Sequence, residues 1–255
     1  MPSLFPVLAA GLVSGTALAD ADLKNDAASY ERCMDTARKE PTDGFEMASV
    51  WKDHGGGLPA EHCAGVALMG LKQYALAGDQ LETLGKEMVR EAPSLRAQVL
   101  SQAAEAWLQN GEPAKAQADL TAAIGLDPKD TSLLIGRARA HAAAKDYKAA
   151  KEDLNRALTG GAAPGEVLTY RAAANRYLGD LAAARKDADA AVAASPESAD
   201  AWLERANIRR LQKDDKGARA DWIKVLDLAP ESPAGDAARD NLATMDVHVE
   251  AAAKR

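Results

Sequence analysis

Apolar and polar positions follow a helical period in the stretch "KGARADWIKVLDL", residues 216–228. Ala218, Trp222 and Val225 recur there at i, i+4 and i+7, which makes one face of the segment apolar. The stretch "DAWLERANIRRLQ" before it has a second apolar face, and "KDD" between the two is a short polar break. The pattern predicts two helices that fold back on each other as an antiparallel hairpin.

The same pattern returns every thirty-four residues. "KDYKAAKEDLNRAL" begins at Lys145, "GDLAAARKDADAAV" at Gly179 and "KDDKGARADWIKVL" at Lys213. Aligned in this way, the chain has a leucine or tryptophan column (Leu100, Leu134, Leu168, Trp202), two alanine columns (Ala104, Ala138, Ala172, Ala206; Ala116, Ala150, Ala184, Ala218) and an aspartate column (Asp119, Asp153, Asp187, Asp221). We expect four units, at 97–130, 131–164, 165–198 and 199–232. Because one hairpin cannot bury its apolar face alone, these units are expected to stack into an all-α solenoid.

The spacing of large, small and proline positions resembles the tetratricopeptide repeat. The first block fills all eight family places, with Leu100, Ala103, Ala104, Trp107, Ala116, Leu120, Ala123 and Pro128. The second block departs from the family pattern at His141 and Ala162, and the third at Asn175 and Ala188. The resemblance implies a right-handed superhelix of antiparallel helical hairpins. It also favours a packed, core role for His141, which stands at an aromatic place.

The flanks of the regular array are expected to be helical as well. Residues 20–96 contain "LMGLKQYALAGDQLETLGKEM", which looks like a degenerate copy of the unit, preceded by a stretch that we interpret as another hairpin. Residues 233–255 begin with a polar, alanine-rich segment suited to cover the last hairpin as a capping helix, followed by a tail that frays.

Arginines recur at the same interval as the aspartates, at Arg137, Arg171 and Arg205. In a stack, the second helix of one unit lies beside the first helix of the next. We therefore expect a structural ladder across units, in which Asp119 meets Arg137, Asp153 meets Arg171 and Asp187 meets Arg205.

Charge argues against a nucleic-acid partner, and hydropathy argues against a membrane-spanning helix. The formal net charge is −7 and the pI is near 5.2, which argues against nucleic acid, because phosphate binding requires a basic surface. No apolar run of membrane-spanning length follows the first twenty residues, so no membrane span is expected.

The first nineteen residues, "MPSLFPVLAAGLVSGTALA", are uncharged and end in the small-x-small pattern Ala17-Leu18-Ala19. This is typical of a signal peptide, so we predict cleavage after Ala19 and a bacterial protein exported to the periplasm. The segment has no lysine or arginine at its front, which leaves a disordered tail or a hydrophobic first helix as the alternative.

Two cysteines, Cys33 and Cys63, remain in the predicted mature chain. In an oxidising compartment they have one intramolecular pairing, and we predict a disulfide between them. The alternatives are a buried reduced pair or a zinc site with His54 and His62. No CxxC or HxxxH spacing supports zinc, so no metal is expected.

Chemical signatures of enzymes are missing from the sequence. It has no GxxxxGK[ST], HExxH or GxSxG motif, and no GxGxxG motif after a strand. "HGGGLP", residues 54–59, resembles an oxyanion loop but lacks a nucleophile elbow, which favours a loop between hairpins. We expect no enzymatic activity and no cofactor.

In the family that the sequence resembles, ligand peptides lie in a concave groove lined by the first helix of each unit. Carrying the groove positions over, residue by residue, gives a predicted binding set of Arg139, Arg176, Tyr177, Leu203, Asn207, Arg210 and Leu211. Arg176 and Arg210 are expected to pair with carboxylates of an extended segment, and the alternative is an ordinary solvated helix face. The Lys-and-Asn clamp of some relatives is absent, since only Asn207 matches it.

The resemblance and the predicted export favour a periplasmic scaffold that binds a protein or peptide partner. A second interpretation is an accessory or regulatory subunit of a cell-envelope enzyme or assembly complex, which binds a folded partner through its edge or through residues 20–96. A more distant third is an enzyme whose site lies in residues 20–96 and requires His54 or His62. The oligomeric state is not predicted.

Overall fold

The computed structural model describes residues 27–253, with side chains as far as Met245. Within this range every regular element is a helix, which confirms the all-α prediction. The first helices are α1 (Ala27–Lys39), α2 (Pro41–Trp51), a π-helical turn η1 (Lys52–Gly56), α3 (Gly57–Gly70) and α4 (Tyr74–Glu87). The regular array follows as α5 (Pro93–Gln109), α6 (Pro113–Leu126), α7 (Thr131–Ala143), α8 (Tyr147–Thr159), α9 (Pro164–Tyr177), α10 (Leu181–Ala194), α11 (Ala199–Leu211) and α12 (Asp215–Leu228), and α13 (Pro233–Ala253) ends it. The predicted leader, residues 1–19, lies outside the described residues.

The helices of the array begin at residue types suited to a helix N-terminus. Proline occupies an early position of α5, α6 and α9, where its missing N–H is not needed. Before α8, α10 and α12, the side chains of Asp146, Asp180 and Asp214 accept a hydrogen bond from the backbone N–H three residues on. These aspartates are again thirty-four residues apart, so the repeat encodes where helices start as well as which face is buried.

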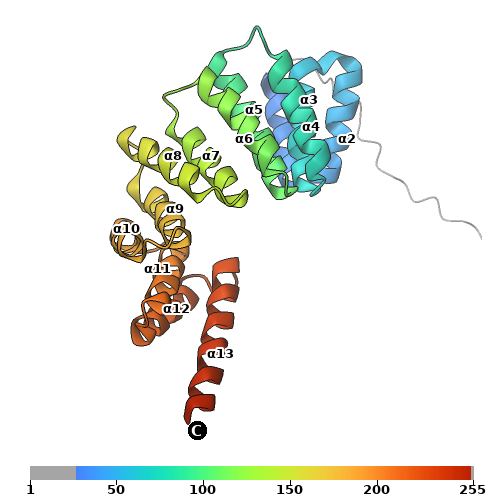
Figure 1. The fold of residues 1–255 in the computed structure, drawn as a ribbon. Coiled ribbons are helices and arrows are strands. Elements are labelled where there is room, and N and C mark those ends of the chain that lie inside the picture. The colour runs from blue at the N-terminus through green and yellow to red at the C-terminus, as the bar shows by residue number, and fades with distance from the viewer. Residues whose placement is uncertain (1–26, 254–255) are drawn as a thin grey trace, which may run out of the picture.

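Consecutive helices pack in pairs: α5 with α6, α7 with α8, α9 with α10, and α11 with α12. Each second helix also packs against the first helix of the next pair, and the first helices α5, α7, α9 and α11 contact one another in order. Figure 1 shows the pairs following one another along a curved path. Helix α13 packs on both α11 and α12, where the first helix of a further pair would lie. The arrangement confirms the solenoid with a C-terminal capping helix.

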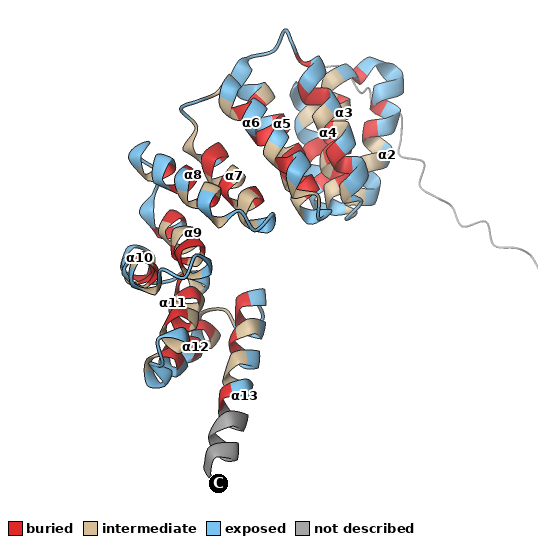
Figure 2. Ribbon diagram, viewed as in Figure 1, coloured by how far each residue is buried: buried red, intermediate tan, exposed pale blue. Residues whose placement is uncertain are grey.

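Small residues let the helices approach closely, and large residues fill the spaces between them. A Cβ added to Gly78 of α4 would lie 2.6 Å from the indole of Trp107, which is 1% exposed. In the last pair, Trp222 packs against alanines that include Ala206 and Ala238. Figure 2 shows the buried residues gathered on the facing sides of the helices. Truncating such a tryptophan to alanine costs about 3–5 kcal/mol, so these side chains dominate the local cores.

The aspartate and arginine columns form ion pairs inside each helical pair. Arg137 donates through Nε and Nη2 to both carboxylate oxygens of Asp153, at 2.7 and 2.8 Å. The same bidentate geometry recurs in the next two pairs, between Arg171 and Asp187 and between Arg205 and Asp221. The prediction that each aspartate meets the arginine of the following unit is therefore wrong.

The turn between the two helices explains the observed pairing. In an antiparallel hairpin, residues equally distant from the turn face each other, and the midpoint of Arg137 and Asp153 is Lys145. Lys145 is a left-handed turn residue with φ 64°. Arg137 Nη1 also donates to Thr121 Oγ1 of the preceding pair, at 3.2 Å, and the other two arginines make matching contacts. Each guanidinium thus joins its own helical pair to the preceding pair. Its partner in the preceding pair lies two residues after the aspartate that the sequence predicted as the contact.

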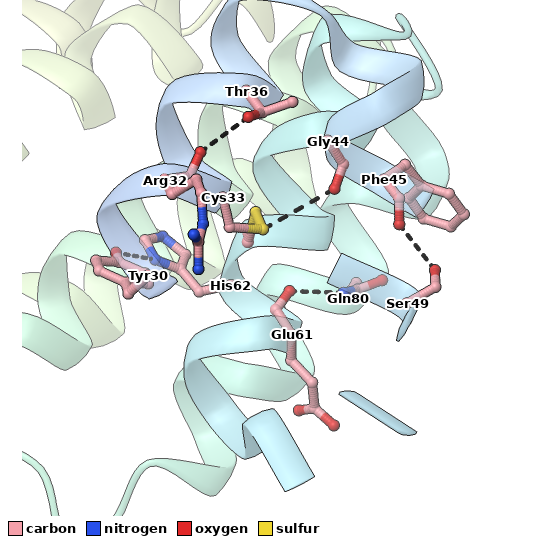
Figure 3. Close-up of a disulfide and its surroundings, with 11 residues drawn as sticks. Tyr30, Arg32, Cys33, Thr36, Gly44, Phe45, Ser49, Glu61, His62 and Gln80 are labelled. Atoms are coloured by element: carbon pink, nitrogen blue, oxygen red, sulfur yellow. Dashed lines mark hydrogen bonds between the residues drawn. A yellow bond between two sulfur atoms is a disulfide. The ribbon is translucent and has the colours of Figure 1, made fainter. Parts of the chain in front are cut away.

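A disulfide joins the first helices. Cys33 of α1 and Cys63 of α3 are bonded, with Cα atoms 6.1 Å apart, as predicted. Figure 3 shows this region, where both cysteines are fully buried and Cys33 Sγ lies near the Gly44 carbonyl of α2. No group of three or more metal-ligating side chains gathers among the described residues. No helix in that range is long and apolar enough to cross a membrane.

Candidate interaction groove

The first helices of the array line two adjoining hollows. The first, of about 330 Å³, lies over α5 and α7, with Glu105, Leu108 and Arg139 in its wall. The second, of about 520 Å³, lies over α9 and α11, with Tyr170, Ala173, Glu197, Asp200, Leu203 and Glu204 in its wall. Glu166, near the start of α9, lines both hollows. We call these two hollows together the groove.

Two of the predicted binding residues, Arg139 and Leu203, line the groove directly. Arg139 is half-buried and donates through Nη1 to Glu105 Oε2 at 2.9 Å. Glu105 stands thirty-four residues before it, at the same place in α5. This ion pair crosses from one first helix to the next and neutralises the arginine.

Arg176 is also neutralised within the chain. Its Nε and Nη2 donate to the two carboxylate oxygens of Glu204 at 2.6 and 3.0 Å. Burial raises the pKa of the Glu204 carboxyl, and the bonds from Arg176 act against that rise. Arg210 in turn donates to Asp215 Oδ1 at 2.8 Å. Both guanidinium groups thus bind carboxylates of the chain itself, Arg176 in a mostly buried ion pair and Arg210 in an exposed one.

Asn207 faces the capping helix. Its Oδ1 accepts hydrogen bonds from Trp222 Nε1 at 3.3 Å and from Asn241 Nδ2 of α13 at 3.4 Å. A residue that packs beneath α13 does not line the groove between α9 and α11. The repeat pattern did not predict this contact, because Asn241 lies in the capping helix, one period after Asn207 and outside the four predicted units.

Tyr177 and Leu211 occupy the same place at the ends of α9 and α11. They are 57% and 54% exposed and lie outside the two groove hollows. The Tyr177 ring stacks on Tyr147 with centroids 4.4 Å apart and planes inclined by 7°, and the Arg176 guanidinium lies 4.3 Å from its centroid. These residues form an exposed edge beside the groove.

Three carboxylates line the groove without a basic partner. Glu166, Glu197 and Asp200 are exposed, and within the described part of the chain none of them forms an ion pair. Burial raises the pKa of the Tyr170 hydroxyl, the Arg139 charge opposes this rise, and Glu166 and Asp200 add to it. The open part of the groove is therefore negatively charged.

Sequence reasoning missed these carboxylates, although a signal was present. Glu166 and Asp200 stand one repeat apart, in the column that also contains Gln98 and Ser132. Extending the Gln98 column by the period of the repeat reaches both acids.

A separate hollow of about 460 Å³ lies beside the disulfide. Its wall is mostly apolar and contains Tyr30, Leu58, Met88, Leu95 and Val99. It opens between α1, α3, α5 and the loop that precedes α5. The sequence did not predict this hollow, since its wall combines residues from four segments.

His62 lies in the wall of this separate hollow, and both of its ring nitrogens are hydrogen-bonded. Nε2 donates to Gln102 Oε1 at 2.6 Å. Nδ1 accepts from the Tyr30 hydroxyl at 2.7 Å, as Figure 3 shows. Burial lowers the pKa of His62, which favours the neutral ring that this bonding requires. His54 is exposed in η1, where Nδ1 donates to the Val50 carbonyl at 2.8 Å. The two histidines occupy different environments and do not form one site.

Comparison with known proteins identifies the repeat. The family model described as "Tetratricopeptide repeat" matches residues 101–167 and 171–233. No curated protein matches the sequence.

Solved structures of similar fold include tetratricopeptide repeat proteins. A tetratricopeptide repeat protein from Parabacteroides merdae is 13% identical, with a TM-score of 0.63 over 84% of this chain and 86% of that one. The C-terminal part of a repeat protein from Cytophaga hutchinsonii is 12% identical, with a TM-score of 0.60 over 78% and 79%. MamA from Desulfovibrio magneticus is 15% identical, with a TM-score of 0.57 over 69% and 97%. At these identities the likeness concerns the fold alone.

Proposed function

This chain belongs to the tetratricopeptide repeat family, and we propose that it is an interaction scaffold that holds an extended segment of a partner protein in the groove of α5, α7, α9 and α11. The observation that carries the proposal is that two hollows lie over successive first helices and share Glu166 in their walls. Hollows arranged in this way suit a chain segment better than a compact small molecule.

The groove is built on rigid elements, which supports this role. Its walls are the first helices, whose positions are fixed by bidentate pairs such as Arg139 with Glu105 and Arg176 with Glu204. A preorganised groove loses little conformational entropy on binding, so most of the ordering cost falls on the partner segment.

Photo-crosslinking in the native cell tests the proposal. A benzophenone side chain at Thr169, in the groove wall, should crosslink to one short segment of a partner, whereas the same probe at Glu152, exposed on α8, should not. Ala173→Trp fills the groove and should remove the Thr169 crosslink, while Ala193→Trp, at an exposed position of α10, should leave it.

A different pattern would support the accessory-subunit alternative. Crosslinks from Leu95, at the hollow beside the disulfide, together with none from Thr169, would place the partner on the N-terminal helices. That pattern would overturn the groove proposal.

We also propose that the protein is exported to the periplasm. The disulfide between Cys33 and Cys63 supports an oxidising compartment, and the predicted leader supplies the route. Intact mass of protein recovered from native cell fractions without reductant should match a chain that begins at Asp20 and has no free thiol. Retention of Met1 with two free thiols would overturn the export proposal.

A further inference from the structure

The groove contains more acid than its own arginines can neutralise. Arg139 is bound by Glu105, and Arg176 by Glu204, so neither cation is available to a ligand. Glu166, Glu197 and Asp200 remain without ion pairs in the described part of the chain. An acidic segment entering the groove would meet these three charges with no compensating cation.

We propose that the groove selects a basic extended segment, in which lysine or arginine side chains alternate with apolar ones. This inference rests on the proposed function and specifies the chemistry of the partner. The charges are placed for it, because Glu166 and Asp200 stand one repeat apart on α9 and α11, with Glu197 in the loop before α11.

Apolar contacts are available between the carboxylates. Leu203, Tyr170 and Ala173 are half-buried in the wall of the same hollow, which Glu166 and Asp200 also line. A bound segment can therefore bury apolar side chains against the wall while its cations reach Glu166 and Asp200. Because these acids are exposed, each ion pair contributes modestly, and the complementary charge acts mainly on the choice of partner.

The ion pair between Arg176 and Glu204 also disfavours an acidic ligand. Breaking Arg176 away from Glu204 to bind a foreign carboxylate would leave a buried glutamate, 8% exposed, without its partner. Breaking a buried pair in this way is strongly unfavourable, so Arg176 stays bound to Glu204. This reverses the charge that the sequence suggested for the ligand.

The test measures the affinity of two defined peptides by fluorescence anisotropy. One contains Lys-Ser-Leu repeated, and the other contains Glu-Ser-Leu repeated to the same length. The first should bind the full mature chain, its affinity should fall as salt is raised, and the second should not bind.

Three variants locate the effect. The groove-neutral variant combines Glu166→Gln, Glu197→Gln and Asp200→Asn. It should lower the affinity for the lysine peptide about tenfold or more. The outer-neutral variant changes net charge equally through Glu46→Gln, Glu152→Gln and Asp227→Asn, all exposed and outside the groove, and should bind as the wild type does. Ala173→Trp should abolish binding. Matching thermal unfolding of all variants confirms that they fold.

The outcomes separate the charge inference from the proposed function. If the groove-neutral variant keeps full affinity while Ala173→Trp loses it, the groove stands and the selection for basic segments is overturned. Equal loss in the outer-neutral variant, tighter binding of the glutamate peptide, or no binding of the lysine peptide at about 1 mM would overturn the inference as well. Unchanged binding in Ala173→Trp, with no crosslink from Thr169, would overturn the groove itself.

Discussion

The first pair of the regular array, α5 with α6, differs from the three later pairs in how it accommodates its aspartate. Asp119 stands in the same column as Asp153, Asp187 and Asp221, but Ala103 takes the place of their arginine partners. Asp119 is 4% exposed, and its Oδ2 has no hydrogen-bond partner among the described residues. Burial raises its pKa to about 7, Glu82 adds to the rise, and Lys86 opposes it. The aspartate of this column therefore stabilises the three later pairs through an ion pair. In the first pair it is destabilising when ionised, because its charge is buried without a partner.

The N-terminal part of the molecule relies on other means of cohesion. The disulfide fixes α1 to α3, and Trp51 and Trp107 are buried beside small residues such as Gly56 and Gly78. Covalent closure and large side chains do not depend on the charge state of a neighbour. The comparison shows that a solenoid can change its stabilising interaction from pair to pair while the helix geometry stays the same.

The largest expected effect is the loss of one ladder arginine. Arg171→Met leaves Asp187 buried with Asn175 as its remaining donor, and should lower the free energy of unfolding by about 4 kcal/mol. Urea unfolding should detect the loss, and hydrogen exchange should place it in α9 and α10. Lys148→Met, at an exposed position of α8, is the matched control and should change little. Equal effects of the two changes would show that the ladder does not stabilise the array.

Removal of the disulfide should have a slightly smaller and differently located effect. Cys33→Ala with Cys63→Ala releases a loop of 30 residues and should cost about 3.5 kcal/mol in α1 to α3. Hydrogen exchange should rise in those helices and stay unchanged in α9 to α12. Reduction of the wild type is the control and should reproduce the same map. A uniform rise along the chain would mean that the two regions unfold as one unit.

The smallest expected effect has the opposite sign. Asp119→Asn removes a buried charge that lacks a partner and should raise the stability by about 1–2 kcal/mol at pH 8. The same substitution at Asp153 should destabilise, because Arg137 and Arg156 lose their carboxylate.

The pH dependence of this gain has a defined direction. The folded-state pKa of Asp119, about 7, lies above its ordinary value of 3.8, so the folded protein holds a proton that the unfolded chain releases. The wild type should therefore lose stability relative to Asp119→Asn as pH rises from about 4 to about 7, and the gap should then level off. Urea titrations across this range test it. A gap that stays constant would show that Asp119 ionises normally in the fold.

The sequence alone determined the period and the helical pairs, and it predicted the disulfide. The period is visible because the same faces are buried in every unit, and the disulfide because the predicted mature chain has two cysteines. The sequence also contained the information for the arginine–aspartate pairing, since Arg137 and Asp153 are equidistant from the turn residue Lys145. The alignment of repeats alone favoured pairing between neighbouring units.

Only the tertiary structure decided which charges remain available to a partner. Arg176 finds Glu204 twenty-eight residues on, Asn207 is covered by α13, and Glu166 keeps no partner in the described part of the chain. A hydrophobic period specifies which face of a helix is buried, because burial depends on the residue type at each position. Whether a guanidinium meets one carboxylate or another depends on the distances between three neighbouring helices, and that geometry appears only when the pairs are stacked.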